Sequence, residues 1–391
     1  MIYLDNSATT RCSEEVTALV CDCMRTDFGN PSSMHHMGVV AEGLVRTAAE
    51  QIARTLGCKR QEILFTSGGT ESDNLAIKGA AHACARRGRH LITTKIEHPA
   101  VLRTMQSLEA EGFEVTYLPV DSEGLVQPEA LAAALRKDTI LVSVMTVNNE
   151  IGTVEPIAEL AALTHERCPE ALFHTDAVQG YSKIPLQPKK QGIDLLAVSG
   201  HKLRGPKGIG FLYIRDGVRL IPEIDGGGQQ NGLRSGTHNV PGIAGMGLAA
   251  EMACRDLTED AARLYALRQH FVKQITETLT DIRINGPAYL GETNRPERVA
   301  PHIVSLSVPG VRAEVLLHAL EDKEIYVSAG SACASNAPHV SGTLSAIGLP
   351  EALLESTIRI SLSVTTTREE LDAAAAALAQ IVPMLRRFTR R

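Results

Sequence analysis

The sequence predicts an α/β protein built around a mostly parallel β-sheet. Short β-rich runs alternate with longer segments of helical spacing that are rich in Ala, Leu, Glu and Arg. Most of the β-rich runs are apolar without alternation, which is typical of strands covered on both faces. Helices on both sides of a parallel sheet account for both observations.

The predicted strands of this sheet follow one another through the first half of the chain. They are residues 63–66, 90–94, 115–120, 139–145, 172–175, 195–199 and 210–214. Residues 129–136 and 157–167 have helical spacing between them. We therefore expect a seven-stranded sheet with helices packed on it.

The pattern changes after a long helical segment at residues 251–267. Strand candidates at 303–308, 326–328 and 359–363 lie among helices, which indicates a smaller α+β domain. A short strand at residues 2–4 could pack on either part. We expect a large domain over residues 14–258 and a small domain formed by residues 1–13 and 259–391.

Composition excludes several classes of protein. Of 391 residues, 44% are hydrophobic, so a large core is possible, and a net charge of −6 lacks the basic excess of a general nucleic-acid binder. No apolar stretch approaches the roughly 20 residues of a membrane helix. The first residues do not resemble a signal peptide, and the basic end around Arg386 and Arg387 is expected to be solvated. Eight scattered cysteines without a Cys-x-x-Cys pair indicate a reduced, cytoplasmic protein without structural zinc.

Unusual residues follow the strands, where open α/β sheets bind their ligands. After residues 63–66, small residues including Gly69 and Thr70 open a helix, so backbone N–H groups could approach a phosphate. An ordinary turn with a helix cap is the alternative. A Walker A loop is excluded, because no Gly-Lys-Ser/Thr follows at the required spacing.

The later strand ends carry titratable and amide side chains. His98, Asn149, Asp176 and Lys202 each follow a predicted strand. Taken singly, each could be a structural histidine, a turn cap, a salt-bridge partner or a solvated lysine. Together, a phosphate cradle, an acid and a later lysine match the needs of pyridoxal phosphate.

Motifs in order along nearly the whole chain support this interpretation. They are Tyr3-Leu4-Asp5-Asn6-Ser7-Ala8-Thr9-Thr10 and residues 29–33, 65–74, 147–152, 174–179, 199–202, 226–229, 234–237 and 330–333. The chain thereby resembles the cysteine desulfurases of the NifS/IscS type, class V aminotransferase-like enzymes of fold-type I that depend on pyridoxal phosphate. The resemblance implies a large domain with a seven-stranded sheet and a small domain that carries a catalytic cysteine.

The resemblance also implies how the cofactor is held. Lys202 carries it covalently and moves the substrate α-proton, Asp176 pairs with the ring nitrogen, and Gln179 contacts the ring hydroxyl. His98 stacks on the ring and assists proton transfer. The phosphate would be held by Gly69, Thr70, Ser199 and His201.

The same resemblance implies a homodimer, a substrate and a sulfur acceptor. Thr237 would reach the partner's phosphate, and Asn149 and Arg359 would hold the carboxylate of L-cysteine. Cys333 would accept the sulfur as a persulfide and pass it to an iron–sulfur scaffold or a thiolation carrier, with L-alanine released. The other cysteines are expected to be inert buried thiols: Cys12, Cys21, Cys23, Cys58, Cys84, Cys168 and Cys254. Neither nucleic acid, a membrane nor a metal is expected as a partner.

Three alternatives stay open from the sequence. Two are other pyridoxal-phosphate reactions: selenocysteine lysis, and β-elimination that yields pyruvate and ammonia. The third is a non-catalytic scaffold that keeps the fold, which the presence of Lys202, Asp176, His98 and Cys333 argues against.

Overall fold

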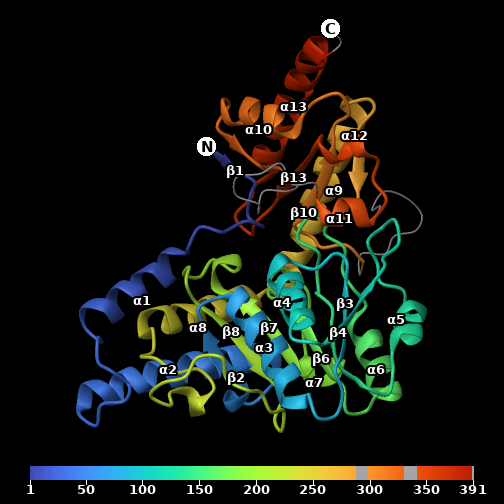
Figure 1. Ribbon diagram of the computed structural model, residues 1–391. Helices are drawn as coiled ribbons and strands as arrows, with labels where there is room; N and C mark the ends of the chain where they lie inside the picture. The colour runs from blue at the N-terminus through green and yellow to red at the C-terminus, as the bar shows by residue number, and fades with distance from the viewer. Residues whose placement is uncertain (288–297, 330–340, 390–391) are drawn as a thin grey trace.

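A computed structural model describes residues 1–287, 298–329 and 341–389 of the chain. Its larger part contains a seven-stranded sheet (Figure 1). The strands are β2 (Ile63–Thr66), β3 (His90–Thr94), β4 (Glu114–Leu118), β5 (Thr139–Ser143), β6 (Leu172–Asp176), β7 (Leu195–Ser199) and β8 (Gly210–Ile214). Their order is β2-β8-β7-β6-β5-β3-β4, and β8 is the one strand of the seven that runs in the opposite direction to the others. The predicted mostly parallel sheet is confirmed.

Alternate side chains of each strand enter two separate cores, because successive residues of a strand point to opposite faces. Phe211 joins one core and Leu212 the other. Helices α3 (Gly69–Cys84) and α4 (Pro99–Ala110) pack on the Leu212 side. The Phe211 side is covered by α2 (His36–Leu56), α5 (Pro128–Ala134), α6 (Ile157–Arg167) and α8 (Val240–Arg255). This is why the strands are apolar without alternation.

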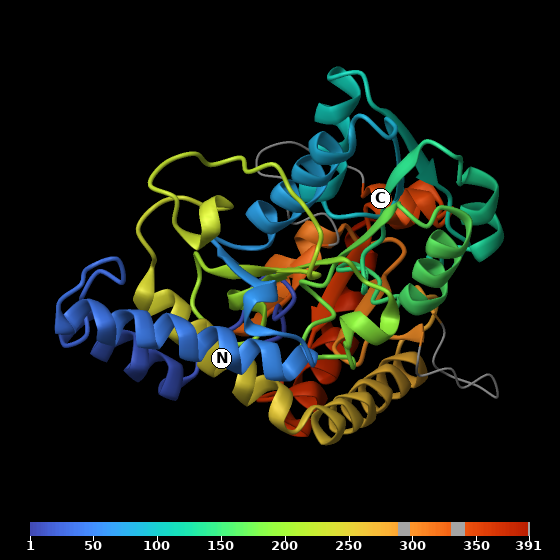
Figure 2. The same cartoon turned by 90° about the horizontal axis from the view of Figure 1, so that it is seen from below.

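Two helices at the start of the chain pack against a much later one. Both α1 (Glu14–Arg25) and α2 contact α8, and Figure 2 shows the three gathered along one side of the larger part. A short helix, α7 (Pro188–Gln191), contacts α6.

The C-terminal part is built on an antiparallel sheet. Its order is β12-β13-β10-β9, from β9 (Arg283–Asn285), β10 (Ile303–Ser307), β12 (Ser328–Ala329) and β13 (Thr357–Ser361). Its helices are α9 (Leu257–Thr278), α10 (Ala313–Glu321), α11 (Gly342–Ala346), α12 (Glu351–Leu354) and α13 (Arg368–Thr389). β1 (Ile2–Tyr3) pairs in parallel with β11 (Ile325–Tyr326), so the N-terminal strand packs on this part. The residue bounds of the two domains stay a prediction.

Three details of the prediction are corrected. The helical segment predicted at 251–267 is two helices, which Asp256 separates with φ −114° and ψ 34°. The strand predicted at 326–328 is two short strands, β11 and β12. The strand predicted at 359–363 lies at 357–361, because Ser363 enters a turn in which its N–H donates to Thr366 Oγ1 at 2.9 Å.

Two expectations about side chains are wrong in part: Arg387 is exposed as expected but Arg386 is not, and of the cysteines expected to be buried Cys12, Cys58 and Cys254 are only half-buried. Arg386 is not simply solvated: its guanidinium donates to the carbonyls of Pro309 and Thr280 at 3.0 Å each, and so ties α13 to neighbouring turns. Cys21 is exposed on α1 rather than buried, while Cys23 on the same helix is buried. The seven cysteines in the described residues are free thiols. None of the helices in the described parts of the chain is both long and apolar enough to span a bilayer.

Candidate active site

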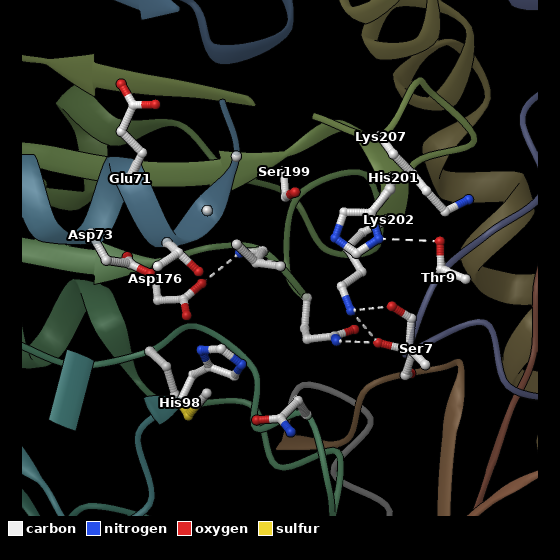
Figure 3. Close-up of a pocket in the computed structure, with 18 of the residues that line it drawn as sticks. Ser7, Thr9, Glu71, Asp73, His98, Asp176, Ser199, His201, Lys202 and Lys207 are labelled. Atoms are coloured by element: carbon white, nitrogen blue, oxygen red, sulfur yellow. Dashed lines mark hydrogen bonds between the residues drawn. The ribbon is translucent and has the colours of Figure 1, made fainter. Parts of the chain in front are cut away.

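A cavity of about 550 Å³ opens where the parallel strands end (Figure 3). Ten of the twelve predicted site residues line it: Gly69, Thr70, His98, Asn149, Asp176, Gln179, Ser199, His201, Lys202 and Arg359. Thr237 is exposed and is not among the lining residues, and Cys333 lies outside the described residues. Residues far apart in sequence meet here because parallel strands end at one edge of the sheet.

One end of the cavity is shaped for an anion. Gly69 begins α3, a helix of 16 residues whose N-terminal N–H groups and dipole favour negative charge. A Cβ on Gly69 would lie 2.7 Å from Val178 Cγ2, so any larger residue here would require the Val178 side chain to shift. The hydroxyl of Ser199 and the side chain of His201 line the same cavity. This donor set fits a phosphate group.

Asp176 lies at the end of β6 and is 4% exposed. Its Oδ1 accepts a hydrogen bond from the Val178 N–H at 2.8 Å. Burial raises the pKa of Asp176, whereas His98 and Lys202 act to lower it. A buried carboxyl that has few partners of its own fits a protonated ring nitrogen, which would supply the missing positive charge.

Lys202 ends a 3₁₀ turn that follows β7, and the N-terminal segment of the chain holds its amine. Lys202 Nζ donates to the carbonyl of Ser7 at 2.5 Å and to that of Ala8 at 2.8 Å. The Ser7 carbonyl also accepts from Gln179 Nε2 at 2.9 Å. In Figure 3 the Lys202 and Ser7 side chains lie side by side at the edge of the cavity.

Burial favours the neutral form of both histidines in the cavity. Burial lowers the pKa of His98, against the opposing charge of Asp176. His98 is the N-cap of α4, and its Nδ1 accepts from the Ala100 N–H at 3.2 Å, so the proton of the neutral ring belongs on Nε2. Burial, together with the charges of Lys202 and Lys207, lowers the pKa of His201 to about 4.

Arg359 crosses from β13 of the small sheet to the cavity. Its Nη1 donates to the Asn149 carbonyl at 2.8 Å, and its Nη2 pairs with Asp5 Oδ1 at 3.0 Å. The side chain of Arg359 is 4% exposed, so the guanidinium is fixed before a ligand arrives. A fixed planar guanidinium suits a carboxylate.

Sequence reasoning assigned no role to four residues that shape this site: Ser7, Asp5, Asp73 and His302. His302 Nε2 lies 3.4 Å from Gln179 Oε1, and His302 is 2% exposed. Ser7, Asp5 and Asp73 lie inside motifs that were recognised, which was the available signal. His302 carried no signal, because only the fold brings it beside Gln179.

Comparison with known proteins finds similar proteins over nearly the whole chain. The model of the family described as aminotransferase class-V matches residues 2–374. A cysteine desulfurase IscS from Dictyoglomus turgidum is 46% identical over 98% of this chain and 95% of its own. A solved NifS-like protein superposes with a TM-score of 0.90 at 39% identity, covering 98% of this chain and 99% of its own. A solved SspA in complex with cysteine gives a TM-score of 0.80 at 35% identity, covering 94% and 100%.

Proposed function

The chain belongs to the class-V aminotransferase family, and from this premise we propose that it is a pyridoxal-phosphate-dependent cysteine desulfurase. It converts L-cysteine to L-alanine and transfers the sulfur to Cys333 as a persulfide. The observation that carries the proposal is that Lys202, Asp176 and His98 line one cavity with the fixed guanidinium of Arg359. A lysine, a buried acid and a carboxylate site in one place are what an amino-acid enzyme of this kind requires.

The residues of the cavity fit the cofactor at both ends. Its phosphate would lie at the N-terminus of α3, held by Gly69, Thr70, Ser199 and His201. Asp176 would face the ring nitrogen, Gln179 the ring hydroxyl and His98 the face of the ring, with Lys202 as the covalent attachment. The bound cofactor supplies a ring that accepts electrons from the substrate α-carbon.

The protein orients the substrate and moves its proton. Arg359 and Asn149 hold the carboxylate of L-cysteine, which fixes the direction of the α-carbon. Lys202 Nζ takes the α-proton, since the two carbonyls around it keep the amine at the edge of the cavity. His98, with its proton on Nε2, is the neighbouring donor that assists the transfer.

Sulfur transfer requires a nucleophile on the protein. The Cys333 thiolate attacks the substrate sulfur, so that an S–S bond forms as the Cβ–S bond breaks, and the carbon skeleton leaves as L-alanine. L-cysteine and one thiol thus yield L-alanine and one persulfide, without an external oxidant. A thiol of an acceptor protein, such as an iron–sulfur scaffold or a thiolation carrier, then takes the outer sulfur by exchange.

The working unit is a homodimer in the cytoplasm. Thr237 is exposed and does not line the cavity of its own chain, which supports a role at the partner's phosphate. Its neighbour Arg234 is anchored by Glu71, with Nε 2.9 Å from Oε1, so the segment that bears Thr237 is tied to the α3 end of the cavity.

Product analysis tests the reaction against its alternatives. The purified protein with pyridoxal phosphate and L-cysteine should yield alanine. Pyruvate and ammonia would instead indicate β-elimination, and turnover of selenocysteine alone would indicate a selenocysteine lyase. Cys333→Ser should abolish alanine formation, while the exposed thiol Cys21, changed to Ser, serves as the matched control.

A further inference from the structure

Three carboxyl groups lie buried together at the Asp176 end of the cavity. Asp73 in α3 is 1% exposed, and Glu97 and Asp176 are 4% exposed each. Figure 3 shows Asp73 and Asp176 next to each other. Burial raises the pKa of Asp73 well above its usual value, and the negative charges of Asp176 and Glu97 raise it further. Three such neighbours cannot all be ionised in a site of low dielectric.

Asp73 has a buried partner that faces it from β6. Asp73 Oδ1 and His174 Nε2 lie 3.5 Å apart, and both are buried atoms to which the described structure gives no hydrogen-bond partner, so each is the other's nearest candidate. The other ring nitrogen, His174 Nδ1, lies 2.8 Å from Ser143 Oγ. Burial lowers the pKa of His174 to about 3, so its ring is neutral and one of its nitrogens carries a proton.

Two placements of the protons would satisfy this arrangement. In one, Asp73 is ionised and accepts from His174 Nε2–H, while Ser143 donates to Nδ1. In the other, Asp73 is protonated and donates to His174 Nε2, while Nδ1–H donates to Ser143. Both placements make the same number of hydrogen bonds, and the charge assistance that an ionised Asp73 would gain is opposed by the cost of burying its charge, so the surrounding charges decide. An ionised Asp73 would be a second buried anion beside Asp176, whereas a protonated Asp73 leaves one.

We propose that Asp73 is a positioning residue that stays protonated and donates to His174, so that the negative charge at this end of the cavity is held by Asp176. The positive charge of Lys202, which faces Asp176, favours its ionised form, as does the hydrogen bond that the carboxylate accepts from the Val178 N–H. Burial raises the pKa of Glu97 well above its usual value and so favours its neutral form, although its Oε1 accepts from Thr94 Oγ1 and the Met145 N–H at 2.9 Å each. The inference that the negative charge of Asp176 pairs with the cofactor ring rests on the proposed function. The inference that Asp73 is protonated does not.

Infrared difference spectroscopy of the holoenzyme tests the protonation directly. Asp73→Asn keeps the shape and a donor for His174 Nε2. The parent-minus-variant spectrum should show the loss of one protonated-carboxyl carbonyl band, which shifts in deuterium oxide. The matched control is Asp138→Asn, an acid whose pKa is lowered by its hydrogen bond with Arg136, so only a carboxylate band should be lost. Loss of a carboxylate band in Asp73→Asn would overturn the proposal.

The visible absorption of the bound cofactor provides a second test. Its pH midpoint depends on the charge of Asp73, which a merely structural role would not affect. Because Asn and protonated Asp are both neutral, the pH midpoint of that absorption should be the same in Asp73→Asn as in the parent. If Asp73 were ionised, removing a negative charge beside the chromophore would lower the midpoint by about one unit or more. If Asp73→Asn does not fold, Asp73→Ser offers another neutral donor for both tests.

The two proposals fail in distinguishable ways. If no alanine forms but the protonated-carboxyl band is lost in Asp73→Asn, the inference about Asp73 stands and the proposed reaction fails. If alanine forms and a carboxylate band is lost instead, the reaction stands and the inference fails.

Discussion

Arg359 and Asp5 form an ion pair in which Nη2 lies 3.0 Å from Oδ1, although 354 positions separate them in the chain. The backbone bridges Asp5 to Ser361 as well, so β13 and the N-terminal segment approach the cavity as one unit. Because Lys202 is held by the carbonyls of Ser7 and Ala8, this segment places both the reactive amine and the guanidinium. The start of the chain is therefore part of the active site.

Loss of the Asp5 charge should weaken substrate binding more than turnover. In Asp5→Asn the amide oxygen still accepts from Arg359, but the bond is no longer between two charges. We expect KM for L-cysteine to rise about 10-fold with kcat little changed, because charge-assisted hydrogen bonds contribute about 1.5–3 kcal/mol. Steady-state alanine formation measures both constants. The exposed Asp322→Asn is the control, and an equal fall of kcat in Asp5→Asn would contradict a positioning role.

Replacing Lys202 should abolish covalent attachment of the cofactor. The cavity contains a second amine, Lys207, which serves as the matched control. After borohydride reduction, the mass of intact Lys207→Ala should include one cofactor, and that of Lys202→Ala should not. The Lys202 variant should also lose at least about 100-fold in kcat, since its proton transfer is removed. A reduced adduct on Lys207 in the parent would contradict the assignment.

Because Gly69 and Val178 lie so close together, we expect a larger residue at position 69 to weaken cofactor binding and a smaller residue at position 178 to restore it. Gly69→Ala places a Cβ 2.7 Å from Val178 Cγ2. Overpacking of about 1–3 kcal/mol should weaken cofactor binding about 10-fold, as fluorescence titration can measure. Removing the Val178 methyl groups in Gly69→Ala/Val178→Ala should restore most of the affinity. Equally weak cofactor binding in the single and double variants would mean that the contact between Gly69 and Val178 does not shape the phosphate site.

The buried carboxyl of Glu155 should make the stability of the fold depend on pH. It is buried, its Oε2 accepts from the Val126 N–H at 3.0 Å, and burial raises its pKa to about 8. Because the pKa of Glu155 is raised in the folded state, its contribution to the free energy of unfolding is fully present below 4.5, the pKa in the unfolded chain. This contribution is lost as pH rises through about 8, the pKa in the folded protein. Glu155→Gln should therefore unfold at a higher temperature than the parent at about pH 9 but not at about pH 5, with a difference on the order of 4 kcal/mol in the free energy of unfolding.

Thermal unfolding with calorimetric detection checks this, with the exposed Glu159→Gln as the control. The same difference in unfolding temperature at both pH values would show that Glu155 is ionised in the folded protein.

Local pattern was enough to predict most of the fold. Strands such as β2, β3, β7 and β8 end where the apolar runs end, because burial on both faces makes the run and the strand coincide. The three residues of β9 were not predicted, since so short a run has no periodicity of its own. The break at Asp256 was also missed, because no proline or glycine marks it.

The candidate site, like the fold, could be predicted from the sequence only in part. Asp176 and Lys202 could be located because each follows a strand, and a parallel sheet gathers strand ends at one edge. The contacts of Asp5, Asp73 and His302 could not be predicted, since each depends on the packing of two segments distant in sequence. Motifs indicate which side chains react, and the fold determines which side chains hold them in place.

The central claim is that Cys333 takes the sulfur of L-cysteine while the carbon skeleton leaves as alanine. Holoenzyme mixed with excess L-cysteine, without reductant or acceptor, should form one alanine per chain, and the peptide that contains Cys333 should gain one sulfur atom in its mass. Cys333→Ser should bind the cofactor and form neither product. Repeated alanine formation by Cys333→Ser, or alanine without added sulfur on Cys333 in the parent, would contradict the account.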